Sequence, residues 1–155
     1  MMDLSMSLSE NFTLGELLRS DTAERHEKLK QEQYNPPPEI VENLQYLART
    51  ALQPIRSLLG SPLRISSGYR CPGINELVGG SATSQHCLGE AADCSLAPGF
   101  LTDPATEAFR NDIASSVQSY LGKPLRPDVS QDFYLFAYLC LHLEELDVDQ
   151  VIHEW

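Results

Sequence analysis

The sequence predicts an α+β fold, in which a small antiparallel sheet is packed with helices. Apolar residues recur at helical spacing through the segment 38–59. The stretches 63–67 and 91–96 are typical of short strands. Residues 147–153 alternate between polar and apolar, which predicts a third strand. The order of these elements indicates an α+β arrangement. A length of 155 residues favours one domain, 1–155, with one core.

The N-terminal third contains clear signals for where helices begin. Glu16 stands three residues after Thr13, the spacing of a capping box, so a short helix is expected to start there. The polar and charged segment 21–35 predicts an exposed loop. Three prolines at 36–38 end this loop and open the helix 38–59, since proline is tolerated in a first helical turn.

The long helix and the later elements follow from similar signals. Pro54 is expected to kink the helix, and Gly60 to end it. The remaining expectations are a short helix at 72–78, a turn at Gly79-Gly80, a helix from Thr102 or Asp103 to Tyr120, a loop at 123–128 and a helix from Ser130 to Glu145. We expect Ile65–Ser67, Ala92–Ser95 and Val148–Ile152 to share one sheet, with helix 38–59 packed on it.

Composition excludes several classes of function. The net charge of −11 argues against nucleic acid, because binding there depends on cationic contacts to phosphate. It equally disfavours adhesion to anionic membranes. No apolar run reaches the roughly 18 residues of a membrane span. The N-terminus shows no basic stretch followed by an apolar block, so a standard secretory signal is not expected.

The four cysteines do not form a recognisable metal or redox motif. None belongs to a Cys-x-x-Cys pair, which argues against a zinc ribbon or a thioredoxin motif. Buried, reduced thiols are favoured over disulfides. The cysteines are Cys71, Cys87, Cys94 and Cys140.

The window 84–93 carries the residues with the clearest chemical meaning. It fits the pattern Ser-x-His-x-x-Gly-x-x-x-Asp, with His86 and Asp93 as potential metal ligands. On a continuous helix these two residues would lie about 10 Å apart along the axis. Fully extended, they would be roughly 23 Å apart. They meet on one ion only if the chain folds back between them, and Gly89 is suited to that bend.

This window belongs to an ordered set of short motifs. They are Phe12-Thr13-Leu14-Gly15-Glu16-Leu17-Leu18, Leu52-Gln53-Pro54-Ile55-Arg56, Ile65-Ser66-Ser67-Gly68-Tyr69-Arg70, Val78-Gly79-Gly80, the window itself and Asp149-Gln150-Val151-Ile152-His153-Glu154. The set resembles the zinc D-Ala-D-Ala peptidase family, in particular its short phage-endolysin-like and bacterial branch, which shares a core with the hedgehog signalling domain. The resemblance covers most of the chain except 96–128, which is longer than the usual family connection and forms either a lid or a rim element.

The resemblance implies a Zn²⁺ cofactor and a site with defined roles. His86 and Asp93 correspond to zinc ligands. Arg70 corresponds to the residue that binds the terminal carboxylate of the substrate; the alternative is a structural salt bridge. Ser84 either contacts substrate or caps a turn, and Tyr69 either lines the pocket or belongs to the core. Glu154 corresponds to the glutamate that acts as general base and then acid.

The sequence departs from the family pattern at its end. The family places a third zinc ligand, the histidine of a Trp-x-His element, beyond this glutamate, whereas the sequence stops at Trp155. Three explanations are open: a truncated chain, replacement of the ligand by His153, or an incomplete site. Truncation is favoured. The 155-residue form is then expected to hold zinc poorly and to show little activity.

Two functions from different classes follow. The first is a zinc-dependent metallopeptidase that cleaves peptidoglycan stem peptides at a bond involving a D-amino acid, as a carboxypeptidase or as an endolysin-type endopeptidase. The second is a non-catalytic hedgehog-like module that uses the metal pocket for binding. For either function we expect a monomer, located in the cytoplasm or released by a route other than a standard signal.

Overall fold

The structure is a computed structural model that describes residues 2–153. The chain forms two compact units: the first comprises residues 1–53 and 65–94, and the second comprises 54–64 and 95–155. The division runs through both strands of the sheet. The expectation of one domain stays a prediction. In the described part of the chain, no helix combines the length and apolar character that a membrane crossing requires.

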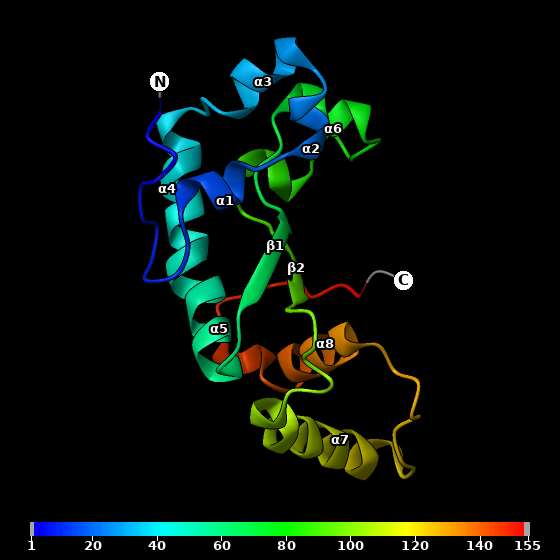
Figure 1. Ribbon diagram of the computed structural model, residues 1–155. Coiled ribbons are helices and arrows are strands. Elements are labelled where there is room, and N and C mark those ends of the chain that lie inside the picture. Colours follow the sequence, from blue (N-terminus) through cyan, green and yellow to red (C-terminus); the bar gives the residue numbers. More distant parts are fainter. Residues whose placement is uncertain (1, 154–155) are drawn as a thin grey trace. The chain divides into compact units, whose positions relative to one another are not determined.

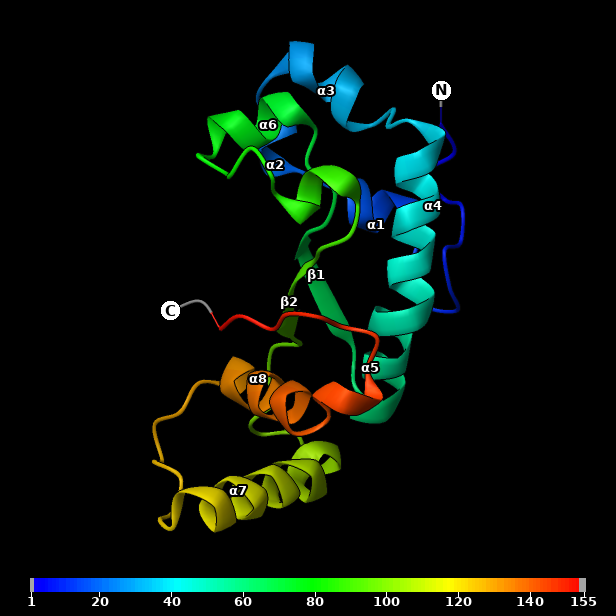
Figure 2. The ribbon, with the colours of Figure 1, turned by 180° about the vertical axis from the view of Figure 1, so that it is seen from behind.

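The first unit is mainly helical (Figures 1 and 2). Its helices are α1 (Leu14–Leu18), α2 (Asp21–Glu24), α3 (Glu27–Gln33), α4 (Pro38–Leu47) and α6 (Pro72–Leu77), with the π-helical segment η1 (Ala48–Leu52) and the 3-10 turn η2 (Gln85–Leu88). Helix α4 packs against α1, and α3 packs against both α2 and α6. The core of this unit is mainly aliphatic, with Leu14, Leu17 and Leu44 fully buried.

The capping box predicted at Thr13 is confirmed. The Glu16 N–H donates to the Thr13 hydroxyl, and the Glu16 carboxylate accepts from the Thr13 N–H at 2.8 Å. These bonds satisfy backbone donors that the first turn of a helix leaves free. They fix the start of α1, whose later carbonyl groups support the candidate site.

The exposed loop expected at 21–35 is wrong. The segment forms α2 and α3, and the Ser20 hydroxyl caps α2 by accepting from the Ala23 N–H at 3.1 Å. The charged and amide residues of this segment are good helix formers, so its polarity does not exclude a helix. Ala23 and Gln33 are fully buried, which attaches both helices to the core.

The long helix predicted at 38–59 is confirmed, although it is not a regular α-helix throughout. Helix α4 continues through η1 into α5 (Gln53–Leu59), as Figure 1 shows. The irregularity expected at Pro54 takes the form of the π-helical segment directly before it. Proline lacks an N–H and crowds the carbonyl of the preceding turn, and a wider turn relieves that conflict. Gly60 follows with φ of 59°, as expected for a helix end.

Within residues 2–153 the sheet has two strands rather than three. Strand β1 (Leu63–Ser67) pairs with β2 (Asp93–Leu96) in an antiparallel sheet. The third strand expected at 148–152 is wrong, because those residues have no regular structure. The Val148 N–H instead donates locally to the Leu146 carbonyl at 2.9 Å. The α+β class is therefore confirmed, while the likeness to the hedgehog domain stays a prediction.

The second unit is built on a helical pair. Asp103 caps η3 (Pro104–Thr106), which leads into α7 (Glu107–Leu121), and Ser130 caps α8 (Gln131–Leu141) before η4 (Leu143–Glu145). Helices α7 and α8 lie side by side (Figures 1 and 2). Their interface has a core of Ile113, Ala137 and Tyr138 with partly buried aromatic residues around it.

Candidate functional site

His86 is held in one orientation by the backbone of the residue that follows β1. Its Nδ1 lies 2.7 Å from the carbonyl oxygen of Gly68, just after β1, and its side chain is only 11% exposed. A carbonyl oxygen can only accept, so Nδ1 carries the hydrogen and donates it. In its neutral form this ring would have its lone pair at Nε2, the atom through which such a histidine binds a metal.

Asp93 faces Nε2 of His86. It opens β2, and its Oδ1 lies 3.3 Å from His86 Nε2. The side chain of Asp93 is 46% exposed, so the pair can be reached from solvent through its carboxylate. The fold-back expected between the two residues is confirmed, because η2 ends at Gly89 in the left-handed region with φ of 72°.

Gly89 is also required by its surroundings. A Cβ at this position would lie 3.0 Å from the Ile40 carbonyl oxygen and 3.2 Å from a methyl carbon of the same residue. The bend therefore packs closely against α4. Both the conformation and the close contact favour glycine, so the loop that joins His86 to Asp93 is anchored to the helical core.

The separation of the two facing atoms fits a shared metal ion. Zinc binds histidine nitrogen at about 2.0–2.1 Å and carboxylate oxygen at about 2.0–2.2 Å, so two tetrahedral ligands lie about 3.3–3.5 Å apart. The observed 3.3 Å falls in this range. The same distance suits a direct hydrogen bond from a doubly protonated His86 ring. Among residues 2–153, no three His, Cys, Asp or Glu side chains are grouped to hold a metal, so this pair supplies two ligands.

Arg70 lies beside the pair. Its backbone N–H donates to the His86 carbonyl at 3.1 Å. The hydrogen bond with His86 lowers the pKa of Asp93, burial opposes this, and the charges of His86 and Arg70 lower it further. The Nε of Arg70 is buried and has no hydrogen-bond partner among the described residues. A buried guanidinium nitrogen without a partner is costly, so this group is suited to an anionic ligand.

A comparison with family sequences bears on these residues. The sequence model of the family described as Peptidase M15 matches residues 10–117, which is more than half of the chain and includes Arg70, His86 and Asp93. The chain belongs to the Peptidase M15 family. The resemblance to zinc D-Ala-D-Ala peptidases is thereby confirmed. No curated protein and no solved structure matches the chain.

Membership of the Peptidase M15 family makes this chain a member of a peptidase family, and so of the hydrolases. Members of the family are generally zinc-dependent. The matched region covers the first part of the segment 96–128, which the motif comparison had left out. It does not reach Asp149-Gln150-Val151-Ile152-His153-Glu154, so the roles predicted for that segment stay predictions.

Tyr69 and Ser84 lie close to the pair in sequence, and the structure places each differently. Tyr69 is buried, and burial raises its pKa to about 12. Its N–H donates to the Leu17 carbonyl at 2.8 Å, which ties this segment to α1. Ser84 is half-buried, and its hydroxyl does not cap η2; its contact with substrate stays a prediction.

His153 belongs to the second unit. Its ring is tilted by 37° against that of Phe136, with 5.3 Å between ring centroids, and meets Phe133 edge-on at 6.5 Å. Its predicted role as a substitute ligand stays a prediction. Glu154, the predicted general base, lies outside the described residues.

The expected state of the cysteines is confirmed in part. All four are free thiols. Cys71 is buried, and burial raises the pKa of Cys94 to about 12. Cys140, in contrast, is exposed, so burial does not hold for every thiol.

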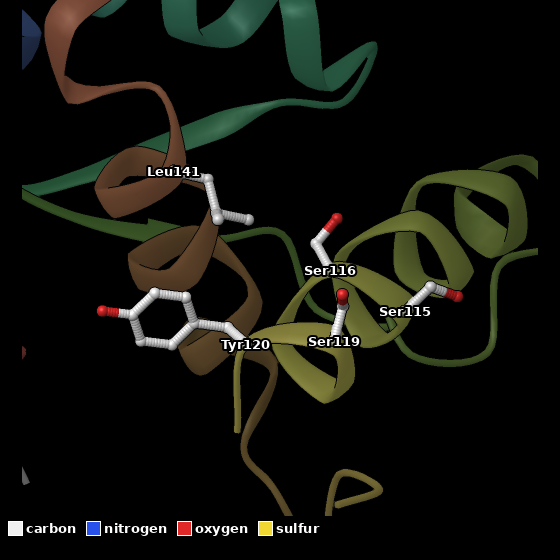
Figure 3. A pocket seen from close by; sticks show the side chains of 5 residues that line it. All are labelled: Ser115, Ser116, Ser119, Tyr120 and Leu141. Carbon is white, nitrogen blue, oxygen red and sulfur yellow. The ribbon is translucent and has the colours of Figure 1, made fainter. Parts of the chain in front are cut away.

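The second unit contains a separate shallow cavity. It has a volume of about 550 Å³ and lies between α7 and α8, lined by Ser115, Ser116, Ser119, Tyr120 and Leu141 (Figure 3). None of the predicted site residues lines it. The cavity therefore adds nothing to the chemistry of His86 and Asp93.

Two residues that matter to the site were missed in the sequence. The sequence marks Gly68 only as part of the Gly-Tyr-Arg motif, yet its carbonyl holds the His86 ring. Gln33 lies in the segment whose polarity predicts an exposed loop, yet it is fully buried and bonds to the backbone on both sides of Arg70. The motif is a signal for Gly68, whereas no local pattern marks Gln33.

Proposed function

We propose that this protein is a zinc-dependent peptidase that cleaves peptidoglycan stem peptides at a bond involving a D-amino acid. The observation that carries the proposal is the pairing of His86 Nε2 with Asp93 Oδ1 at 3.3 Å, with His86 Nδ1 already engaged by Gly68. This is the arrangement expected of two zinc ligands in which a second contact fixes the ring.

Each residue has a distinct part in this scheme. His86 and Asp93 hold the metal, and zinc bound there supplies Lewis acidity and lowers the pKa of water at the site. The Arg70 guanidinium binds the C-terminal carboxylate of the stem peptide through parallel hydrogen bonds. Ser84 contacts the peptide beside His86. Glu154 takes a proton from the attacking water and delivers it to the leaving amine.

The composition agrees with a small peptide substrate rather than a polyanion. With a net charge of −11, the protein repels nucleic acids at long range. Arg70, whose Nε is buried beside the site, offsets this repulsion locally for one carboxylate of the substrate. Terminal cleavage as a carboxypeptidase uses Arg70 directly, whereas an endopeptidase would bind a different part of the stem peptide there.

Hydrolysis of defined muramyl peptides tests the proposal. The complete gene product is incubated with stem peptides that end in D-Ala-D-Ala, and the products are identified by mass spectrometry before and after metal chelation. Zinc-dependent release of a D-amino acid or a shorter peptide is expected, together with its loss in His86→Ala. His26→Ala is the matched control, because His26 is exposed at the start of α3. Zinc binding without any turnover would instead support the non-catalytic module.

A further inference from the structure

Gln33 is a fully buried polar residue at the end of α3. Its side chain reaches the segment that follows β1. A buried amide costs folding free energy unless its hydrogen-bonding groups are paired, so the identity of its partners shows what the residue does.

The Gln33 amide binds the backbone on both sides of Arg70. Its Nε2 donates to the Tyr69 carbonyl at 2.7 Å, and its Oε1 accepts from the Cys71 N–H at 2.9 Å. The remaining hydrogen of Nε2 goes to the Leu18 carbonyl at 2.8 Å, which ties the amide to α1. These three bonds use both donors of the amide and one of its acceptor positions.

Two further bonds complete the support of this segment. The Tyr69 N–H donates to the Leu17 carbonyl, and the Arg70 N–H donates to the His86 carbonyl. The peptide groups on either side of Arg70 are thus held by α1, by η2 and by Gln33. Of these contacts, only Gln33 reaches the segment through a side chain, so its effect can be removed by substitution.

We propose that Gln33 is a positioning residue that holds Arg70 where it binds the terminal carboxylate of the substrate. This rests on the proposed function, in which Arg70 binds that carboxylate. The chemistry requires a group that donates twice and accepts once within one plane, as glutamine does. A glutamate would place an acceptor against two carbonyl oxygens, and a methionine would leave three buried backbone groups without partners.

The test compares peptide substrates that end in a free carboxylate with the same peptides ending in an amide. Wild-type protein is expected to prefer the free acid, and Arg70→Ala is expected to lose that preference. Gln33→Met should reduce kcat/KM for the acid by about 10- to 100-fold, because small misplacement of a binding group has costs of that order. The rate for the amide should change little, so the acid-to-amide ratio falls toward that of Arg70→Ala.

A merely structural role predicts a different outcome. If Gln33→Met only lowers the fraction of folded protein, both rates fall together and the ratio is unchanged, which would overturn the proposal. Gln33→Asn keeps the amide on a shorter side chain and should give an intermediate ratio; it replaces the methionine variant if that one does not fold. Gln31→Met is the matched control, since Gln31 is exposed on the same helix.

Failure of the proposed function can be separated from failure of this inference. If the wild-type protein hydrolyses none of the peptides, the same ratio is measured as binding of N-acetyl-D-alanine and of its amide by nuclear magnetic resonance. Preference for the acid that is lost in both Arg70→Ala and Gln33→Met supports the role of Gln33. Equal binding of acid and amide by the wild-type protein, or an unchanged preference in Gln33→Met, refutes it.

Discussion

Replacing Gly68 with alanine should damage the fold and the metal site together. A Cβ at this position would lie 2.4 Å from the Leu17 carbonyl oxygen and 3.0 Å from two further backbone atoms of Leu17. Ordinary contact between nonbonded atoms begins near 3.5 Å, so the two segments must separate by up to about 1 Å. The obstacle is backbone, which cannot rotate away as a side chain can.

The expected cost follows from the contacts that this separation weakens. Overpacking costs about 1–3 kcal/mol. The bonds from Tyr69 N–H to Leu17 and from His86 Nδ1 to Gly68 contribute about 0.5–1.5 kcal/mol each. Alanine also lowers the conformational entropy of the unfolded chain, which offsets about 0.4–1 kcal/mol of this loss in stability. The free energy of unfolding should therefore fall by about 1–6 kcal/mol, a large part of a typical value of about 5–15 kcal/mol.

Urea unfolding and zinc titration measure the two effects of Gly68→Ala. Because the carbonyl that orients His86 moves, zinc affinity should fall by about 10- to 100-fold, as for other contacts that orient a ligand. Gly73→Ala is the matched control, since its Cβ would meet only the end of the Leu29 side chain, at 2.5 Å. Equal stability and equal zinc affinity in the two variants would refute the account of Gly68.

Three further predictions concern the site. His86→Ala and Asp93→Ala should each abolish peptide hydrolysis while circular dichroism shows a folded protein; full activity in either would exclude it as a ligand. Arg70→Ala should raise KM and lower kcat but leave zinc content unchanged by elemental analysis; loss of zinc would reverse its assignment. Burial raises the folded-state pKa of Tyr69 to about 12, so its contribution to stability is present below pH of about 10 and is lost as the pH rises through 12. Ultraviolet titration should show one phenolate forming at a pH of about 12, a step that disappears in Tyr69→Phe and persists in Tyr120→Phe. If this high-pH step remains in Tyr69→Phe, it belongs to another tyrosine.

Features that depend on neighbouring residues could be predicted from the sequence. The capping box at Thr13, the N-cap at Ser130 and the left-handed turn at Gly89 each follow from local chemistry. Gly89 made the meeting of His86 and Asp93 possible, but its prediction rested on the resemblance to the zinc peptidase family. Local spacing was sufficient for the caps alone.

Features that depend on distant partners could not be predicted in this way. The alternation at 148–152 suggested a strand, but a strand needs a paired neighbour, and periodicity does not provide one. The polarity of 21–35 predicted a loop where the chain forms two helices. Charged residues of high helix propensity occur on exposed helices as well as in loops, so polarity does not distinguish the two. The role of Gln33 depends on backbone partners up to 38 positions away, so no local pattern reveals it.

Calorimetric titration of Zn²⁺ into the complete gene product, its Asp93→Asn variant and its Asp112→Asn variant tests the central claim most directly. Asp112 is an exposed carboxylate on α7 and serves as the control. We predict one zinc ion per chain in the wild-type protein and in Asp112→Asn. In Asp93→Asn, zinc should bind more weakly by more than about 100-fold. Losing a zinc ligand should cost more affinity than losing a hydrogen bond that only orients a ligand, for which the loss is about 10- to 100-fold. Equal zinc affinity in all three proteins, or no zinc binding by the wild-type protein, would contradict the assignment of His86 and Asp93 as zinc ligands.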